Sequence, residues 1–330
     1  NANLMYQPNK DRYENMPYRN AGSSGLKLPE IQLGMWHNFS ADSDMQNCRN
    51  MLFTAFDCGI TLFDLANNYS NSTAENVVGE IIRKHLANYR DELLVTSKAG
   101  YIAWEGPYGT WGSKKSVIAS LDRSLKKTGL EYFDIFYSHR YDPDTPLEET
   151  IGALALAVQQ GKALYLGISN YPAAAAARAK AIADDFRVPM VVNQLRYNIF
   201  DRRIENDSVQ DMSDLGIVCF SPLEQGLLSE RYINEIPSGS RAANPDYPWL
   251  DPERVEAKIK KVRALNELAR ERGQTLPQMA IQWLLTRKNV CSVLIGASNP
   301  NQISNCAEAV KKPPLSDAEL KRIDDIALKS

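Results

Sequence analysis

The segment CGITLFDLANNY, residues 58–69, decides how the rest of the chain is interpreted. A glycine at position 59 is typical of a helix end, and the short apolar, β-branched run after it predicts a strand. Asp64 and Tyr69 come at the polar end of that run, so an acid and a phenol follow the strand. If neighbouring strands also end in polar groups, the pattern indicates a (β/α)8 barrel, in which active sites lie at the carboxyl ends of the strands.

Two further predicted strands end in the same way. Residues 92–97 lead into Lys98, and residues 132–138 lead into His139. Four polar or ionisable side chains therefore follow three successive strands, which favours one shared site at the mouth of a barrel.

Strand and helix patterns alternate along roughly 270 residues, which predicts a single α/β TIM (β/α)8 barrel. A hairpin over residues 18–28 is expected to cap the closed end of the barrel, and extra C-terminal helices to pack outside it. A doubly wound sheet is the alternative, but no GxGxxG follows any strand. The expected strands are 31–34, 60–64, 92–98, 132–139, 163–169, 190–194, 217–221 and 290–295, and the main expected helices are 44–57, 74–86, 113–127, 147–160, 255–272, 276–287 and 317–328, with others beginning at 172 and ending at 215.

The chain reads as one domain with two irregular segments. Residues 1–17 are polar and are expected to form a flexible N-terminal segment, whereas residues 18–330 form the barrel domain. A long segment from Pro222 to about Leu250 interrupts the alternation, and we expect it to cover the site as a lid.

Composition excludes several classes of function. A net charge of −2 over 330 residues gives no basic surface for nucleic acid or an anionic membrane. The five cysteines are odd in number and lack CxxC or Cys/His metal spacing, so we expect buried, reduced thiols and no metal site. No run approaches the ~18 apolar residues of a membrane span, and residues 1–4 lack a signal-peptide core, so a cytoplasmic protein is expected.

Asp64, Tyr69, Lys98 and His139 form a chemically coherent set for carbonyl reduction. A nearby ammonium favours phenolate and is expected to lower the pKa of Tyr69, while a carboxylate keeps Lys98 charged and directed. Tyr69 would then be the general acid, and His139 could bind the same carbonyl oxygen. Each residue also has a structural explanation, respectively as a turn cap, loop packing, a solvated strand end and a hydrogen-bonded histidine at the barrel mouth.

Seven segments, in order along the chain, resemble the aldo-keto reductase family. The resemblance runs from about residue 18 to residue 328, and within the family it is greatest to the branch that contains the potassium-channel β subunits and the bacterial L-glyceraldehyde 3-phosphate reductases. GPYG at 106–109 and EQGLL at 224–228 carry the likeness to this branch. The family segments are DLANNY (64–69), SK (97–98), DIFYSH (134–139), GISN (167–170), NQ (193–194), FSPL (220–223) and LIGAS (294–298).

The resemblance implies an NADPH-dependent reductase with Tyr69 as acid, Lys98 and Asp64 as its tuning groups, and His139 orienting substrate. It further implies that Phe220 stacks on the nicotinamide and that Arg241 discriminates for the 2′-phosphate of NADPH. The family often has Glu-Asn where this chain has Asn305-Cys306, so adenine contacts there are expected to differ. The implied cofactor residues are Trp36, Asp64, Ser169, Asn170, Gln194, Phe220, Ser221, Pro222, Leu223, Glu224, Gly226, Arg231, Ser240, Arg241, Gly296, Ser298, Gln302 and Asn305.

Aromatic and basic residues near the strand ends are candidates for substrate contacts. Arg140 or Arg196 could supply a cation for a phosphate-bearing aldehyde. The expected substrate wall consists of Trp36, His37, Tyr69, Trp104 and His139, with Trp111 beside them.

Three functions remain open from the sequence. The first is reduction of a small aldehyde or ketoaldehyde, such as L-glyceraldehyde 3-phosphate or methylglyoxal, by NADPH. The second is a cofactor-sensing regulatory subunit that resembles the channel β subunits, in which asparagine tends to stand at the position of His139. The third, a sugar-phosphate isomerase, gives the four polar residues no evident role. The resemblance also implies a homo-oligomer, with a tetramer as the expected form.

Overall fold

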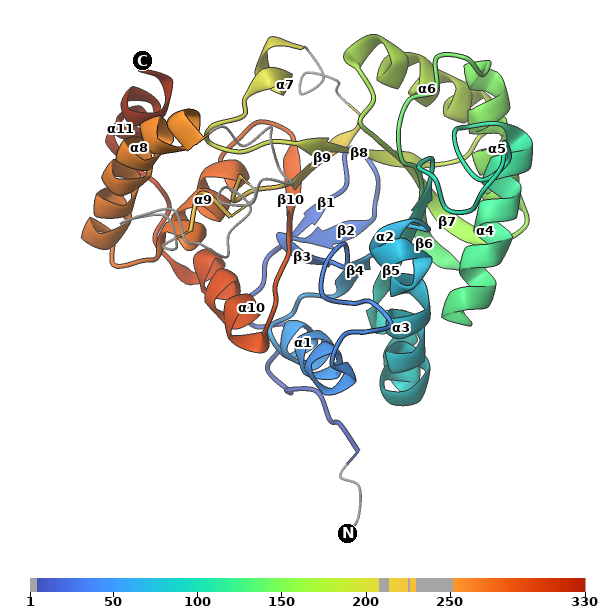
Figure 1. Cartoon of the computed structure of the whole chain (residues 1–330), viewed down its shortest axis with the longest axis horizontal. Coiled ribbons are helices and arrows are strands. Elements are labelled where there is room, and N and C mark those ends of the chain that lie inside the picture. Colours follow the sequence, from blue (N-terminus) through green and yellow to red (C-terminus); the bar gives the residue numbers. More distant parts are fainter. Residues whose placement is uncertain (1–4, 208–213, 225, 230–251, 330) are drawn as a thin grey trace.

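Eight parallel strands close into a barrel, as the alternating pattern predicts, and helices surround it (Figure 1). The computed structural model describes residues 5–207, 214–224, 226–229 and 252–329. Neighbouring strands follow the chain in order, and the last pairs with the first through the register of Val293 with Ile31. The barrel strands are β3 (Ile31–Gly34), β4 (Leu62–Asp64), β5 (Leu94–Ala99), β6 (Phe133–Ser138), β7 (Ala163–Ser169), β8 (Met190–Arg196), β9 (Gly216–Phe220) and β10 (Val290–Ile295).

The helices begin and end where side chains satisfy their terminal backbone groups. The Asp44 carboxylate accepts from the backbone N–H of Gln46 at the start of α1, and Gly129 ends α4 in a left-handed conformation at φ 70°. The described helices are α1 (Met45–Asp57), α2 (Tyr69–Ser72), α3 (Ala74–Ile81), which continues as a π-helical turn to Leu86, α4 (Lys114–Thr128), α5 (Leu147–Gln159), α6 (Ala173–Asp185), α7 (Arg203–Asn206), α8 (Pro252–Glu271), α9 (Leu276–Leu285), α10 (Pro300–Ala307) and α11 (Asp317–Leu328).

The expected N-terminal hairpin consists of β1 (Tyr18–Asn20) and β2 (Lys27–Pro29), and it lies across the centre of the ring of strands in Figure 1. Ala21 and Leu28 of the hairpin are fully buried in one apolar cluster with Leu62, Ile135 and Val191 of the barrel. The hairpin therefore closes one end of the barrel, and the carboxyl ends of the strands remain for the site.

Strand alternation separates an apolar floor from a polar mouth inside the barrel. Leu62 belongs to the interior cluster, and Asp64, two residues later, points the same way. Ile135 and Tyr137 belong to the same cluster and lead to His139. A second, larger apolar core, which includes Phe63, Val95 and Phe136, lies between the strands and the helices. The polar side chains predicted from the sequence thus reach one end of the barrel.

Residues 5–17, expected to be flexible, make specific contacts with the barrel instead. The Tyr6 ring stacks on Phe53 of α1 with centroids 3.9 Å apart, and its hydroxyl donates to Asp57 at 2.7 Å. Arg12 forms an ion pair with Glu92, and Met16 is buried. The polar composition of this segment gave no indication that these few side chains contact the barrel.

The helix expected to end at residue 215 is described only as the short α7, and of the expected lid only residues 222–224 and 226–229 are described. All five cysteines are free, and all except the partly exposed Cys58 are buried, as expected. Among the described helices, none is both long and apolar enough to cross a membrane.

The contact between α3 and α4 depends on the absence of a side chain at Gly79. A Cβ atom there would lie 2.4 Å from the backbone of Thr128, which cannot move independently of its helix. We expect Gly79→Ala to lower the free energy of unfolding by about 1–3 kcal/mol through overpacking. Chemical denaturation with urea measures this change.

Gly152 in α5 provides the matched control. A Cβ atom there meets the Phe186 ring at 3.4 Å, an ordinary contact. Gly152→Ala should therefore leave stability unchanged or raise it by up to ~1 kcal/mol through helix propensity. Equal effects of the two substitutions would contradict the packing explanation.

Candidate active site

Asp64, Lys98 and Tyr69 form one buried hydrogen-bonded group at the mouth of the barrel. The Lys98 ammonium donates to Asp64 Oδ2 at 2.6 Å and to the Tyr69 hydroxyl at 3.0 Å. Its third hydrogen bond goes to the backbone oxygen of Leu65 at 2.8 Å. An ammonium has three N–H groups, so all of its donors are used and the nitrogen is held in one position.

Thr96 completes this group, although the sequence analysis did not single it out. Its hydroxyl donates to Asp64 Oδ1 at 2.6 Å, and its side chain is fully buried. Both carboxylate oxygens of Asp64 therefore have a partner. The clue available in the sequence is spacing, because Thr96 lies two residues before Lys98 and so faces the same side of β5.

Burial decides the protonation state of the phenol. Burial raises the pKa of Tyr69, and the nearby Lys98 ammonium lowers it by a smaller amount, so the pKa lies above its ordinary value. The expectation that Lys98 would bring this pKa below its ordinary value is wrong for this structure. Burial acts to lower the pKa of Lys98, but the Asp64 carboxylate and the Tyr69 phenol raise it above its usual range. Tyr69 is thus a phenol beside an ammonium at neutral pH.

His139 packs edge-on between two tyrosine rings. Its ring centroid lies 5.8 Å from that of Tyr69 and 4.6 Å from that of Tyr101. Burial, followed by the charges of Lys98 and Arg140, holds the pKa of His139 well below its ordinary value, so the imidazole is neutral. Nδ1 of His139 is buried and has no hydrogen-bond partner in the described chain. The sequence analysis missed Tyr101, for which the only available signal in the sequence is its position in the loop after Lys98.

The end of β7 lies against the end of β8 beside this group. The Ser169 hydroxyl donates to the backbone oxygen of Gln194 at 2.8 Å, and the Asn170 amide donates to the backbone oxygen of His139 at 3.1 Å. The side-chain nitrogen of Gln194 is buried beside the Tyr137 hydroxyl and forms no other hydrogen bond among the described residues. Ser169, Asn170 and Gln194, three of the implied cofactor residues, are therefore adjacent, and they leave one amide donor of Gln194 for a ligand.

A tight turn follows β9 at Phe220. Ser221 and Glu224 have left-handed backbones, with φ of 54° and 47°. The turn, which runs through Pro222 and Leu223 to Gly226, is joined to β8 by Arg196, whose guanidinium forms an ion pair with Glu224 at 2.7 Å. Arg196 also forms an ion pair with Asp201 at 2.9 Å. Two carboxylates thus contact this arginine, one of them, Asp201, shared with Arg203. This disfavours the hypothesis that Arg196 binds a substrate phosphate.

The segment after β10 begins at Gly296 and leads to α10. The Gln302 side chain accepts from the backbone N–H of Ser298 at 2.7 Å. Asn305 accepts from the Thr275 hydroxyl at 3.1 Å, which links α10 to the start of α9. Arg231, Ser240 and Arg241, the remaining expected cofactor residues, lie outside the described residues.

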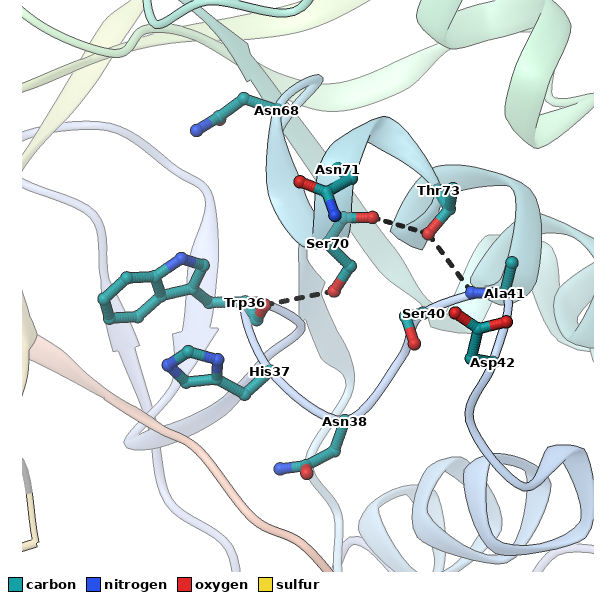
Figure 2. A pocket seen from close by; sticks show the side chains of 10 residues that line it. All are labelled: Trp36, His37, Asn38, Ser40, Ala41, Asp42, Asn68, Ser70, Asn71 and Thr73. Carbon is teal, nitrogen blue, oxygen red and sulfur yellow. Dashed lines mark hydrogen bonds between the residues drawn. The ribbon is translucent and has the colours of Figure 1, made fainter. Parts of the chain in front are cut away.

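A cavity of about 540 Å³ opens beside the loop after β3 (Figure 2). Trp36 and His37 lie side by side on one wall, with ring centroids 4.3 Å apart, and Trp36 is 54% exposed. Ser70 and Asn71 also line the cavity, and the Ser70 hydroxyl donates to the backbone oxygen of Trp36 at 3.2 Å. Trp104, another residue of the expected substrate wall, does not line this cavity, and the guanidinium of Arg123 lies 4.4 Å from the centroid of its ring. The described residues contain no cluster of His, Cys, Asp and Glu that could hold a metal ion.

Comparison with known proteins identifies the family. Residues 30–328 match the model of the aldo/keto reductase family. This chain belongs to the aldo/keto reductase family. It is an oxidoreductase of a family that uses nicotinamide cofactors.

Relatives of this aldo/keto reductase include two named L-glyceraldehyde 3-phosphate reductase, from Escherichia coli K12 and O157:H7, at 45% and 44% identity over 97% of this chain and 95% of each relative. A putative voltage-gated potassium channel subunit beta of Schizosaccharomyces pombe is 34% identical over 98% of this chain and 96% of the relative. A thermostable aldo-keto reductase crystallised with the inhibitor epalrestat superimposes with a TM-score of 0.74 at 26% identity, covering 94% of this chain and all of the other.

The neutral, buried His139 makes the stability of this reductase sensitive to acid. The unfolded chain binds a proton at this residue below about pH 6.5 and the folded chain does not, so stability falls as pH falls below that value. Between about pH 7.5 and 5.5 the wild type should lose about 1.4 kcal/mol of unfolding free energy through His139. The His139→Gln variant should not lose this part. Urea unfolding at several pH values measures the difference.

His85→Gln is the control, because His85 is only partly buried and burial lowers its pKa less than it lowers that of His139. It should reproduce most of the pH dependence of the wild type. If His139→Gln and the wild type lose the same stability in acid, the neutral state of His139 is contradicted.

Proposed function

We propose that this protein reduces small aldehydes or ketoaldehydes to alcohols with NADPH, and that Tyr69 donates the proton. The observation that carries the proposal is the saturated ammonium of Lys98. Because Lys98 uses a donor on the Tyr69 oxygen, that oxygen acts as an acceptor toward the protein. The phenol proton is therefore available to a substrate oxygen.

Each of these side chains has a separate role in the proposed carbonyl reduction. Asp64 and Thr96 hold Lys98, and Lys98 stabilises the negative charge that develops on the Tyr69 oxygen when its proton leaves. His139 is neutral, so one ring nitrogen can donate a hydrogen bond to the carbonyl oxygen without adding a charge. Both groups then face the same oxygen, and the polarised carbonyl carbon accepts a hydride.

The chain has groups that fit a nicotinamide cofactor. The side-chain amide of Gln194 can donate its remaining N–H to the carboxamide oxygen, beside Ser169 and Asn170. Phe220, partly exposed at the end of β9, offers a ring face to the nicotinamide. When bound, the cofactor supplies hydride. We assign its preference for NADPH to Ser240 and Arg241.

Two small substrates follow from the relatives and from the site. The two Escherichia coli relatives are named for reduction of L-glyceraldehyde 3-phosphate. Methylglyoxal presents the same aldehyde group on a similar three-carbon skeleton. We propose Trp36 and His37, on the wall of the cavity in Figure 2, as substrate contacts.

A cofactor-sensing regulatory subunit is the second candidate function. The 34% identity with a putative potassium channel subunit beta favours it. The two candidates differ in turnover, because a sensor retains cofactor without rapid reduction of an aldehyde.

The phenol of Tyr69 provides the direct test. Tyr69→Phe removes the proton donor and keeps the ring, so we expect turnover to fall by about 10²- to 10⁴-fold. The assay follows NADPH oxidation by absorbance with both enantiomers of glyceraldehyde 3-phosphate and with methylglyoxal. NADPH affinity, measured by fluorescence titration, should stay within about threefold of the wild type, because the phenol is not a proposed cofactor contact.

Tyr101→Phe is the matched control, since it removes a phenol beside the same histidine but not the proposed donor. It should retain most of the turnover. If the wild type binds NADPH tightly and reduces no aldehyde, the regulatory function replaces the reductase. If Tyr69→Phe keeps full turnover, another group donates the proton.

A further inference from the structure

Arg140 lies next to His139 in the sequence and over two aromatic rings in the structure. Its guanidinium carbon lies 3.4 Å from the centroid of the Trp111 ring and 4.4 Å from that of Tyr101. Tyr101 in turn contacts His139, with ring centroids 4.6 Å apart. One ring therefore separates the guanidinium from the imidazole that faces the proposed carbonyl site.

Backbone and hydroxyl oxygens, but no carboxylate, bind this arginine within the described chain. Nε donates to the backbone oxygen of Gly100 at 3.1 Å, and one terminal nitrogen donates to the Thr110 hydroxyl at 3.1 Å. Among the described residues, no acidic side chain lies within ion-pair distance of Arg140. The contrast is Arg196, whose charge is balanced by Asp201 and Glu224.

Backbone hydrogen bonds hold the loop between β5 and α4 in one conformation beside the guanidinium. The backbone N–H of Trp111 donates to the same Gly100 oxygen at 2.8 Å, which closes the loop at its base. The Ala103 N–H donates to the Gly109 oxygen at 2.9 Å within the loop. Arg140 is only partly buried and Trp111 is 41% exposed, so the stack reaches solvent at the mouth.

We propose that Arg140, stacked between Tyr101 and Trp111, binds the phosphate group of a phosphorylated aldehyde whose carbonyl lies at Tyr69 and His139. A guanidinium presents a planar set of donors that matches a phosphate, and a fixed guanidinium loses less freedom on binding. The charge of Asp142 acts on Arg140 at longer range, but its carboxylate oxygens already accept from Gly112, Asp144 and Thr145. Arg140 therefore has no carboxylate bound to it, which favours an anion there. This assignment rests on the proposed reductase function and selects phosphorylated substrates over methylglyoxal and unphosphorylated aldehydes.

The test compares L-glyceraldehyde 3-phosphate with L-glyceraldehyde, which differ only in the phosphate. We expect Arg140→Gln to lower kcat/KM for the phosphorylated substrate by about 10- to 100-fold more than for the unphosphorylated one. Arg140→Lys should retain part of the preference, because it keeps the charge and loses the planar donors. A purely structural role would lower both values by the same factor, and that result, or no change in either value, would overturn the proposal.

Arg123→Gln is the matched control, because Arg123 also stacks on a tryptophan of this loop, Trp104. It should leave the ratio of the two kcat/KM values unchanged, and an equal loss of preference in this variant would overturn the specific role of Arg140.

A binding measurement keeps the inference testable if the wild type reduces neither substrate. Saturation-transfer NMR with NADP⁺ bound should then detect glycerol 3-phosphate but not glycerol on the wild type, and neither on Arg140→Gln. Equal signals from the wild type and the variant would overturn the phosphate site. In that case the absence of turnover contradicts the proposed function, whereas the NMR result decides the phosphate site separately.

Discussion

The site depends on an ion pair between Lys98 and Asp64 that is wholly removed from solvent. A buried ammonium is costly unless its charge is balanced and every N–H has an acceptor. The barrel meets both conditions, because Asp64, Leu65 and Tyr69 accept the three hydrogen bonds. The strands must therefore hold a fixed register, with Asp64 opposite Thr96 on β5.

The same register explains why the two ends of the barrel differ. Inward positions toward the hairpin carry apolar side chains such as Leu62 and Ile135, which pack against Leu28. Inward positions at the other end carry Asp64, Lys98 and His139. Burial at the floor stabilises the fold through the hydrophobic effect, so the mouth can hold charged and neutral polar groups that contribute chemistry at some expense of stability. This separation is common to (β/α)8 barrels, and here a two-residue period along each strand produces it.

Sequence reasoning recovered the type and order of the elements because they depend on local periodicity. It placed β7 at 163–169 and β10 at 290–295, the bounds that the structure has. It missed the anchoring of residues 5–17, because Tyr6 contacts a helix that lies far along the chain. For the site, it named the four central residues and missed Thr96 and Tyr101, whose roles depend on which side chains they face.

The sequence by itself determined which chemical groups follow which strands, since a strand, its end and its inward positions are read from neighbouring residues. Only the tertiary structure decided how those groups act on one another. The pKa of Tyr69 rises because burial outweighs the charge of Lys98, and no local pattern contains that balance. Likewise Arg196 and Arg140 look equivalent along the chain, but folding places two carboxylates against the first and aromatic rings against the second. Apart from Asp201, which is five residues from Arg196, the partners are distant along the chain, and closure of the barrel sets their distances.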